Sequence, residues 1–289
     1  MYDENNSTYK PLHCFNRTWI KVFHKGQCLL MSSIQKAHLD RLYRKYNHAQ
    51  FIKPDPLEIL YRYEEPRDRE IAGLIAALLA YGGVKQIVSG ASNAVGRMGK
   101  SPCRFVIKSS RSELQNAFRG FRHRWTRGSD LVALLCGVRS AIDEYGSLEE
   151  SFLVGLRGED ETILPALSAW VALLRSASSK SSCDLLSCPR RGSACKRLNL
   201  FLRWMARHDE VDPGLWTRVP ASKLIVPLDL HMHRIAKAWE FTRRKNADLK
   251  TALEVTTAFR EISPADPVKY DFALTRASMR GDLPVRSFQ

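Results

Sequence analysis

The stretch Gly192-Ser-Ala-Cys-Lys-Arg-Leu-Asn-Leu-Phe-Leu-Arg-Trp-Met205 contains a turn that runs into a helix. It follows Pro189-Arg-Arg, and proline and glycine so close together predict a turn. Beyond the turn, four apolar side chains recur at helical spacing, which predicts a helix face buried in a core. They are Leu198, Phe201, Leu202 and Met205. We therefore expect a helix at about 195–207, with Lys196 in its first turn.

Helical patterns extend over most of the chain around this stretch. The segment from Ile71 to Tyr81 is almost continuously apolar and ends at Gly82-Gly83, so we expect a core helix capped by Asp68. Asp55-Pro56 and Asp266-Pro267 each predict a helix start. Further helices are expected at about 34–46, 84–98, 111–119, 129–145, 147–156, 161–177, 230–240, 248–262 and 267–280.

These patterns predict an all-α fold, a helical bundle in two lobes with a cleft between them, because strand signals are confined to Lys223–Val226. A cleft between lobes is a common ligand site. Residues 1–30 have no sustained periodicity, so we expect a poorly ordered N-terminal extension or a wrongly assigned start, followed by a single two-lobed domain at 31–289. The 44% hydrophobic and 26% charged residues exclude a disordered chain.

The charge of the chain indicates a polyanionic partner. With 45 Lys and Arg against 30 Asp and Glu, the formal net charge is +15, which suits nucleic acid better than an anionic membrane surface. The longest apolar run is too short to cross a bilayer, and the first thirty residues lack the apolar segment of a signal peptide. We therefore expect a cytoplasmic, nucleoid-associated protein that makes no membrane contact.

Two segments concentrate the positive charge. Residues 104–127 carry a net +6, with Phe118, Phe121 and Trp125 among the arginines, and residues 190–207 carry +6 with no acid. Basic groups neutralise phosphates, and aromatic rings among them stack on bases. The alternative is a solvated basic surface whose aromatic rings belong to the core. If the two segments lie on unrelated faces, the surplus charge is only a surface property.

Lys196 and Asp229 are the candidate catalytic residues. The helix dipole places partial positive charge beside Lys196, which disfavours the ammonium form and so favours a nucleophilic amine. The alternative for Lys196 is an exposed lysine without a role. Asp229 follows the apolar run Leu224–Leu228 and is expected to cap the helix at 230–240. An ordinary cap and a carboxylate held in a cleft are compatible interpretations of this aspartate.

No metal site is expected. His231 and His233 are two residues apart on a helix, so they face different directions. Cys183, Cys188 and Cys195 do not form a paired C-x-x-C pattern, and no cysteine follows them. We therefore expect reduced structural thiols.

The stretch 192–205 and the later Pro227-Leu-Asp-Leu-His-Met-His-Arg234 together resemble the helix-hairpin-helix (HhH-GPD) DNA glycosylase superfamily, over about residues 33–283. The chain is also similar to a bacterial family of conserved hypothetical proteins within or beside that superfamily. Asp229, His231 and Arg234 match the Val-Asp-x-His-x-x-Arg element of endonuclease III-like enzymes, and Lys196 matches their catalytic lysine. The separation of 33 residues between Lys196 and Asp229 is most similar to that in archaeal 8-oxoguanine glycosylases.

The sequence departs from this pattern at two places. The hairpin reads Cys188-Pro-Arg-Arg-Gly192, where those enzymes have a glycine-rich hairpin of the Leu-Pro-Gly-Val-Gly type. The iron–sulfur cysteines that follow the aspartate in some members are missing here. The resemblance therefore implies an enzyme without a cofactor or metal.

The activity that the resemblance implies is that of a monomeric DNA glycosylase and AP lyase acting on duplex DNA. Such an enzyme flips a damaged base, for which an 8-oxoguanine-like lesion is the first guess, and cleaves its N-glycosidic bond. Lys196 would form a Schiff base at the anomeric carbon, while Asp229 would stabilise the cationic sugar. The residues implied to contact DNA are Arg119, Arg122, Arg124, Arg190, Arg191, Gly192, Ser193, Arg197, His231 and Arg234. The candidates for the base pocket are Trp125, Trp204, Trp216 and Tyr270.

Two other functions fit the same residues. One is a non-catalytic nucleic-acid-binding protein that keeps the scaffold, which the altered hairpin favours. The other is a monofunctional glycosylase, in which Asp229 activates water and Lys196 only contacts phosphate.

Overall fold

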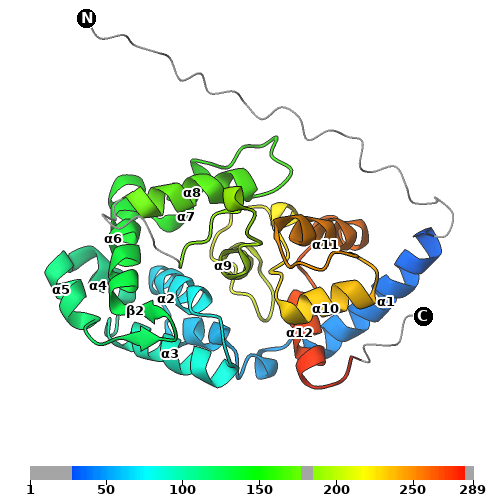
Figure 1. Ribbon diagram of the computed structural model, residues 1–289, viewed down its shortest axis with the longest axis horizontal. Helices are drawn as coiled ribbons and strands as arrows, with labels where there is room; N and C mark the ends of the chain where they lie inside the picture. The colour runs from blue at the N-terminus through cyan, green and yellow to red at the C-terminus, as the bar shows by residue number, and fades with distance from the viewer. Residues whose placement is uncertain (1–27, 177–184, 284–289) are drawn as a thin grey trace, which may run out of the picture.

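The computed structural model describes residues 28–176 and 185–283, and these residues form an all-α protein with one small hairpin (Figure 1). The α-helices are α1 (Cys28–Tyr46), α2 (Pro66–Leu78), α3 (Val84–Gly96), α4 (Pro102–Lys108), α5 (Arg111–Ala117), α6 (Gly128–Tyr145), α7 (Leu148–Leu153), α8 (Leu164–Ser176), α9 (Lys196–Ala206), α10 (Leu230–Ala238), α11 (Leu249–Ile262) and α12 (Asp271–Met279). The 3-10 helices are η2 (Ala49–Phe51), η3 (Pro56–Arg62), η4 (Pro189–Arg191) and η5 (Ala221–Lys223). Strands β1 (Arg122–His123) and β2 (Thr126–Arg127) pair antiparallel.

Helix α9 lies between two groups of helices. Figure 1 shows α2 to α8 on one side of it and α1, α10, α11 and α12 on the other. The helix packs against α2, while α12 packs against both α1 and α10. Because neighbours surround α9, every side chain from Leu198 to Met205 is buried, including Asn199 and Arg203. The sequence predicted the bounds of α9 to within one residue. The side chains between its four predicted core residues are buried as well.

Asp68 does not cap α2 as expected. The helix begins two residues earlier, at Pro66, because the fixed φ angle of proline suits a first helical turn. The Asp68 carboxylate instead accepts hydrogen bonds from Ser101 Oγ at 2.9 Å and from Cys103 N at 2.8 Å. It therefore stabilises the N-terminus of α4, a helix that the sequence analysis did not predict.

The helix start expected at Asp55-Pro56 is confirmed, as a 3-10 helix in which the Asp55 carboxylate accepts from Leu57 N. Two further expectations are corrected by the structure. Asp266-Pro267 does not start a helix, since α12 begins at Asp271 and Asp266 Oδ2 accepts from Arg207 Nε. No strand forms at Lys223–Val226, because Ala221–Lys223 is the 3-10 helix η5 and the next residues have no strand partner.

Most boundaries of the remaining predicted helices are confirmed. Helix α3 and helices α5 to α11 begin and end within three residues of their predicted bounds. Helix α1 starts at Cys28, so the expected boundary at residue 31 falls inside a helix. Residues 1–27 lie outside the described part of the chain. Of the described helices, none combines the length and apolarity that crossing a membrane requires.

A buried acid on α2 gives the fold a measurable pH dependence. Glu70 is 6% exposed and accepts a hydrogen bond of 2.6 Å from Trp216 Nε1. Burial raises the pKa of the Glu70 carboxyl to about 7, against the opposing effect of this bond. Because the folded state holds the proton more tightly than the unfolded state, this contribution to stability is complete below pH 4.5 and is lost as the pH rises towards 7.

Glu70→Gln is expected to remove this dependence, because the amide keeps an acceptor for Trp216 and never ionises. From pH 4 to pH 8, the variant should gain about 3 kcal/mol in unfolding free energy relative to the wild type. Urea unfolding of both proteins at the two pH values measures the change. A stability difference that does not vary with pH would mean that the pKa of Glu70 is the same in the folded and unfolded states, so that burial does not raise it.

Candidate functional site

Lys196 is the first residue of α9, and its side chain reaches the C-terminal end of α2. The helix follows Cys195, whose φ of 47° is left-handed, and the half-buried Lys196 Nζ donates to Ala80 O at 3.3 Å. Arg197 Nη1 donates to Leu78 O at 2.9 Å. The carbonyls at a helix C-terminus carry partial negative charge and attract cations. Lys196 and Arg197 therefore hold the start of α9 against carbonyl groups at and just beyond the end of α2.

Asp229 caps α10, as predicted. Its Oδ1 accepts a hydrogen bond of 2.9 Å from Met232 N. The preceding residues 224–228 are buried, whereas Asp229 is partly exposed. The cap leaves Oδ2 without a hydrogen bond from any residue in the described ranges. A fixed carboxylate therefore directs one free oxygen out of a buried segment.

Asp271 connects these two residues. It is the first residue of α12, and Arg203 Nη1 donates to its Oδ2. Burial raises the pKa of the Asp271 carboxyl to about 6, and the nearby negative charge of Asp229 acts in the same direction. The positive charges of Arg203 and Lys196 act in the opposite direction and lower this pKa. Lys196 and Asp229 therefore both lie near the Asp271 carboxyl. They do not form an ion pair with each other within the described residues.

Sequence analysis missed Asp271, because no local signal distinguishes it. The predicted start at residue 267 placed it inside a helix, where an acid gives no particular signal. In the structure, Asp271 and Lys196 each lie in the first turn of a helix, α12 and α9 respectively. Asp229 is the residue immediately before α10. Helix N-termini carry partial positive charge and suit anions. The start of each of these three helices therefore supplies one titratable side chain to the candidate site.

Two of the basic residues in 190–207 are used inside the protein. Arg203 donates to Asp212 Oδ1 as well as to Asp271, and both acids are buried. Arg207 donates to Asp212 Oδ2 at 2.8 Å and to Asp266 Oδ2 at 2.7 Å. Arg203 is 3% and Arg207 4% exposed, so neither contributes to a DNA-binding surface. The basic surface of this segment is therefore smaller than its net charge of +6 suggests.

An aromatic stack joins the β1–β2 hairpin to this site. The Tyr81 ring stacks on Trp125, with 4.5 Å between centroids and 14° between planes. Arg197 Cζ lies 5.3 Å from the Tyr81 ring centroid, and Arg124 Cζ lies 4.7 Å from that of Trp125. Tyr81 also donates to His123 O in β1. The hairpin of the basic segment 104–127 thus lies beside the start of α9, so these parts of the two basic segments are not on unrelated faces.

Of the four base-pocket candidates, only Trp125 is accessible, with 60% of its surface exposed. Trp204, Trp216 and Tyr270 are each at most 2% exposed. Trp216 packs with other aromatic rings and donates to Glu70, while the Tyr270 hydroxyl donates to Asp40. These three side chains therefore pack in the core, and of the four candidates Trp125 alone is open to a base.

The DNA-binding candidates divide in a similar way. Exposed side chains belong to Arg119, Arg122, Arg124, Arg190, Arg191, His231 and Arg234. Gly192, with a left-handed φ of 76°, donates its N–H to Pro189 O and accepts from Leu249 N, and Ser193 Oγ accepts from Cys195 N. The hairpin groups expected to hold a phosphate are therefore engaged within the protein, and its free cations are Arg190 and Arg191.

The structure assigns no metal ligands in this region. In the described ranges, no three His, Cys, Asp or Glu side chains cluster in a way that could hold a metal ion. His233 Nε2 is hydrogen-bonded to Arg244 O, and His231 is exposed. Cys188 and Cys195 are free thiols, and burial raises the pKa of Cys195 to about 11. Cys183 lies outside the described residues.

Comparison with known proteins places the chain in a family. The family described as "Protein of unknown function (DUF2400)" matches residues 55–280, a segment that contains Lys196, Asp229 and Asp271. No curated protein and no solved structure matches the chain. Because the matched segment is well over half of the sequence, the chain belongs to the DUF2400 family.

Proposed function

We propose that this protein is a DNA glycosylase with AP lyase activity, in which Lys196 is the nucleophile and Asp229 the catalytic carboxylate. One observation supports the proposal: Lys196 at the start of α9 and Asp229 before α10, which are 33 positions apart in the sequence, both lie near the buried carboxyl of Asp271. The HhH-GPD resemblance gives this pair its chemistry.

The proposal extends to the shape of the protein and to its setting. The helix groups on either side of α9 (Figure 1) would be the two lobes of an HhH-GPD glycosylase. The DNA would enter between them. The protein would act as a monomer on nucleoid DNA in the cytoplasm. Support for a nucleic-acid partner comes from the net charge of +15 and from the exposed arginines near the start of α9 and on the β1–β2 hairpin.

In the proposed mechanism, a damaged base is flipped out of the duplex towards Lys196. The Lys196 amine attacks the anomeric carbon, the bond from that carbon to the base nitrogen breaks, and the departing base takes up a proton. The free Oδ2 of Asp229 would stabilise the positive charge that develops on the sugar. Opening of the sugar ring then gives a Schiff base on Lys196, from which β-elimination cuts the strand. To react, Lys196 must first leave its hydrogen bond to Ala80 O.

Borohydride trapping tests this proposal. The purified protein is mixed with duplex DNA that contains an abasic site, 8-oxoguanine or another lesion of a panel, and the Schiff base is reduced to a stable amine. We expect a covalent protein–DNA adduct with at least one of these substrates. No adduct with any lesion, together with DNA binding that weakens as salt rises, would contradict the proposal and support a non-catalytic protein.

The variant Asp229→Asn distinguishes the helix-capping role of Asp229 from its proposed catalytic role. Asparagine caps a helix about as well as aspartate, so the unfolding free energy should change by only about a few tenths of a kcal/mol, whereas Asp229→Ala should cost about 1 kcal/mol. Base release should nevertheless fall by about 100-fold or more, because the amide cannot stabilise a cation in the same way. Single-turnover base release and urea unfolding measure the two effects. Full activity in Asp229→Asn would make Asp229 a cap and nothing more.

A non-catalytic DNA-binding protein is the second candidate. It is favoured by the contact of Lys196 Nζ with Ala80 O, which holds the amine on α2 rather than on Asp229. A monofunctional glycosylase would be indicated by base release without trapping. The same assay therefore distinguishes all three functions.

A further inference from the structure

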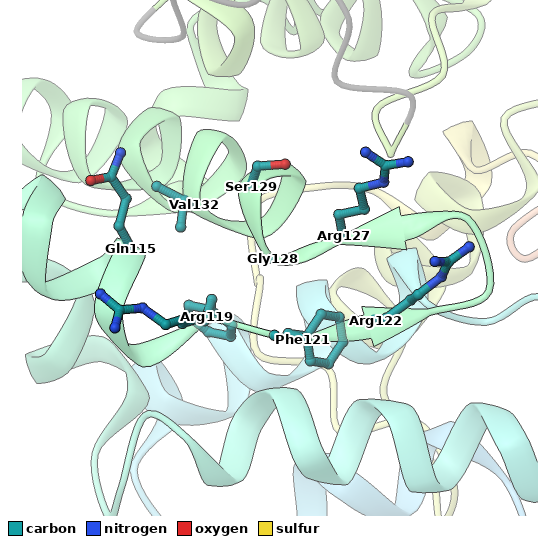
Figure 2. Close-up of a pocket in the computed structure, with 10 residues that line it drawn as sticks. Gln115, Arg119, Phe121, Arg122, Arg127, Gly128, Ser129 and Val132 are labelled. Atoms are coloured by element: carbon teal, nitrogen blue, oxygen red, sulfur yellow. The ribbon is translucent and has the colours of Figure 1, made fainter.

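The tip of the β1–β2 hairpin presents an exposed tryptophan that the proposed mechanism does not use. Trp125 is 60% exposed, more than any other aromatic side chain in the described residues. Tryptophan side chains are highly buried in most proteins, so this exposure is unusual. Trp125 does not line the hollow between the hairpin and the start of α6, which Figure 2 shows. Its ring is therefore presented at the surface and not inside this hollow.

The geometry of the turn does not explain the two residues at the tip. Arg124 and Trp125 lie between the paired residues His123 and Thr126, so they form a two-residue hairpin turn. Arg124 has a left-handed φ of 52°, a conformation that glycine and asparagine adopt more readily in such turns. Backbone outliers of this kind cluster at functional sites. We therefore look for the role of this pair in what its side chains can contact.

The hairpin is held firmly against the rest of the protein. The Tyr81 hydroxyl donates to His123 O at 2.9 Å and is hydrogen-bonded to Thr126 Oγ1 at 2.5 Å. The His123 ring is 5% exposed and packs edge-on against Tyr81, with 4.9 Å between centroids. Helix α3 fits closely around it, since a Cβ at Gly90 would lie 2.4 Å from His123 Nδ1. The tip therefore has a fixed position from which to present Trp125.

The exposed face of the hairpin brings like charges together. Arg122 and Arg127 are opposite each other on the two strands, and both are exposed (Figure 2). Like charges at such positions destabilise a hairpin. The Arg127 guanidinium makes no hydrogen bond or ion pair with a residue in the described ranges, and that of Arg122 uses only Nε, which donates to Arg124 O at 3.0 Å. No acid within residues 114–129 balances these charges, whereas the phosphates of a bound strand would.

The Trp125 ring continues a stack that begins inside the protein. It lies 4.5 Å from the Tyr81 ring, which is the one aromatic ring that it contacts in the described ranges. Arg124 Cζ lies 4.7 Å from the Trp125 centroid and makes no hydrogen bond or ion pair with a described residue, so this side chain can turn towards a phosphate. Aromatic side chains stack on nucleobases with little regard to sequence. In a duplex the neighbouring bases cover both faces of a base, so Trp125 favours an unpaired one.

We propose that Trp125 stacks on an unpaired base of a nucleic-acid strand, while Arg122 and Arg127 contact phosphates of the same strand. This contact rests on the proposed function for the class of its partner, but it needs no chemistry at Lys196. Arg197 Cζ lies 5.3 Å from the centroid of Tyr81, the inner ring of the stack. A strand held at the tip would therefore pass near the start of α9.

Fluorescence anisotropy of the whole protein with short labelled single strands tests the contact. One strand is an oligodeoxythymidylate, and the other has the same number of phosphates but an abasic tetrahydrofuran unit at every position. In Trp125→Ala, binding of the first strand should weaken by about tenfold or more, and binding of the abasic strand by less than about twofold, because only the first can stack. Trp125→Phe keeps a ring and should recover most of the affinity.

The salt dependence of binding tests the arginines. Arg122→Gln should reduce the slope of log affinity against log salt by about 0.7 for both strands, because one phosphate contact is lost. The matched control is Arg243→Gln, which removes an exposed arginine beyond α10, on the other side of α9 from the hairpin. This control should leave the slope unchanged.

The outcomes separate stacking from charge and from catalysis. Equal losses on the two strands in Trp125→Ala, or no loss on either, would overturn the inference. Binding to anionic phospholipid vesicles, weakened in Trp125→Ala, without binding to either strand would overturn it too and identify a membrane surface. A borohydride-trapped adduct with strand binding that does not depend on Trp125 would remove this contact and keep the glycosylase. Trp125-dependent strand binding without any trapped adduct would keep the contact and remove the glycosylase.

Discussion

Lys196→Gln is expected to abolish the borohydride-trapped adduct and to lower strand cutting at an abasic site by about 10³-fold or more. The amide has no nucleophilic nitrogen, so no Schiff base forms. The variant can still donate a hydrogen bond to Ala80 O and keeps most of the length of the side chain. DNA affinity should fall only by the small factor that the loss of one positive charge causes, since the exposed arginines of the β1–β2 hairpin remain.

A matched control uses a lysine at the other end of α2. Lys100 is exposed and precedes Ser101, whose hydroxyl donates to Asp68 in the first turn of α2. Lys196 instead contacts the carbonyl end of that helix. Lys100→Gln removes the same charge and should leave trapping unchanged. If Lys196→Gln and Lys100→Gln trap equally, another amine forms the adduct and the assignment of Lys196 is wrong.

Arg203→Met is expected to destabilise the fold by about 3–5 kcal/mol, because it leaves buried carboxylates without their partner. Arg203 binds Asp212 through Nη2 at 3.0 Å and Asp271 through Nη1. Methionine has a similar apolar stem and no charge. Asp212 would keep its bond from Arg207, but Asp271 would lose its only hydrogen-bond partner among the described side chains. Urea unfolding at pH 7 measures the loss.

The exposed pair of Arg218 and Glu150 is the matched control for this variant. Both side chains are about half exposed, so Arg218→Met should cost less than about 1 kcal/mol. If Arg203→Met is too unstable to purify, the double variant Arg203→Met with Asp271→Asn should recover part of the stability, since one unpaired buried charge is removed. Equal costs for Arg203→Met and Arg218→Met would show that the buried network adds nothing beyond a surface pair.

Sequence periodicity predicted the fold class and most of the helices, because each long helix buries a regular row of apolar side chains. The errors occur where a partner distant in the chain decides. Asp68 looked like the cap of its own helix, but it binds Ser101 and Cys103 across to α4. The β1–β2 hairpin has strands of two residues, too short for an alternating pattern to show.

The candidate site was predicted in part for the same reason. Lys196 and Asp229 carry local signals, one at a turn before a helix and the other at a cap, and both appear where the sequence placed them. Asp271 carries no such signal, because its importance comes from Arg203, 68 residues earlier. The burial of Trp204 and Trp216 depends on how α9 and its neighbours pack, which the composition of a basic segment does not reveal.

Helix α9 is attached at both of its ends to opposite sides of the molecule. Near its N-terminus, Arg197 donates to the last carbonyl of α2, that of Leu78, and Lys196 donates to Ala80 O just beyond that helix. Near its C-terminus, Arg203 binds Asp271 of α12, and Arg207 donates to the Tyr43 hydroxyl of α1. The two helix groups therefore cannot separate without breaking either the hydrogen bonds of Lys196 and Arg197 or the buried ion pair of Arg203 with Asp271. We therefore expect the spacing of the two helix groups to stay constant. Under the proposed function, the duplex rather than the protein would have to bend and unpair to bring a base to Lys196.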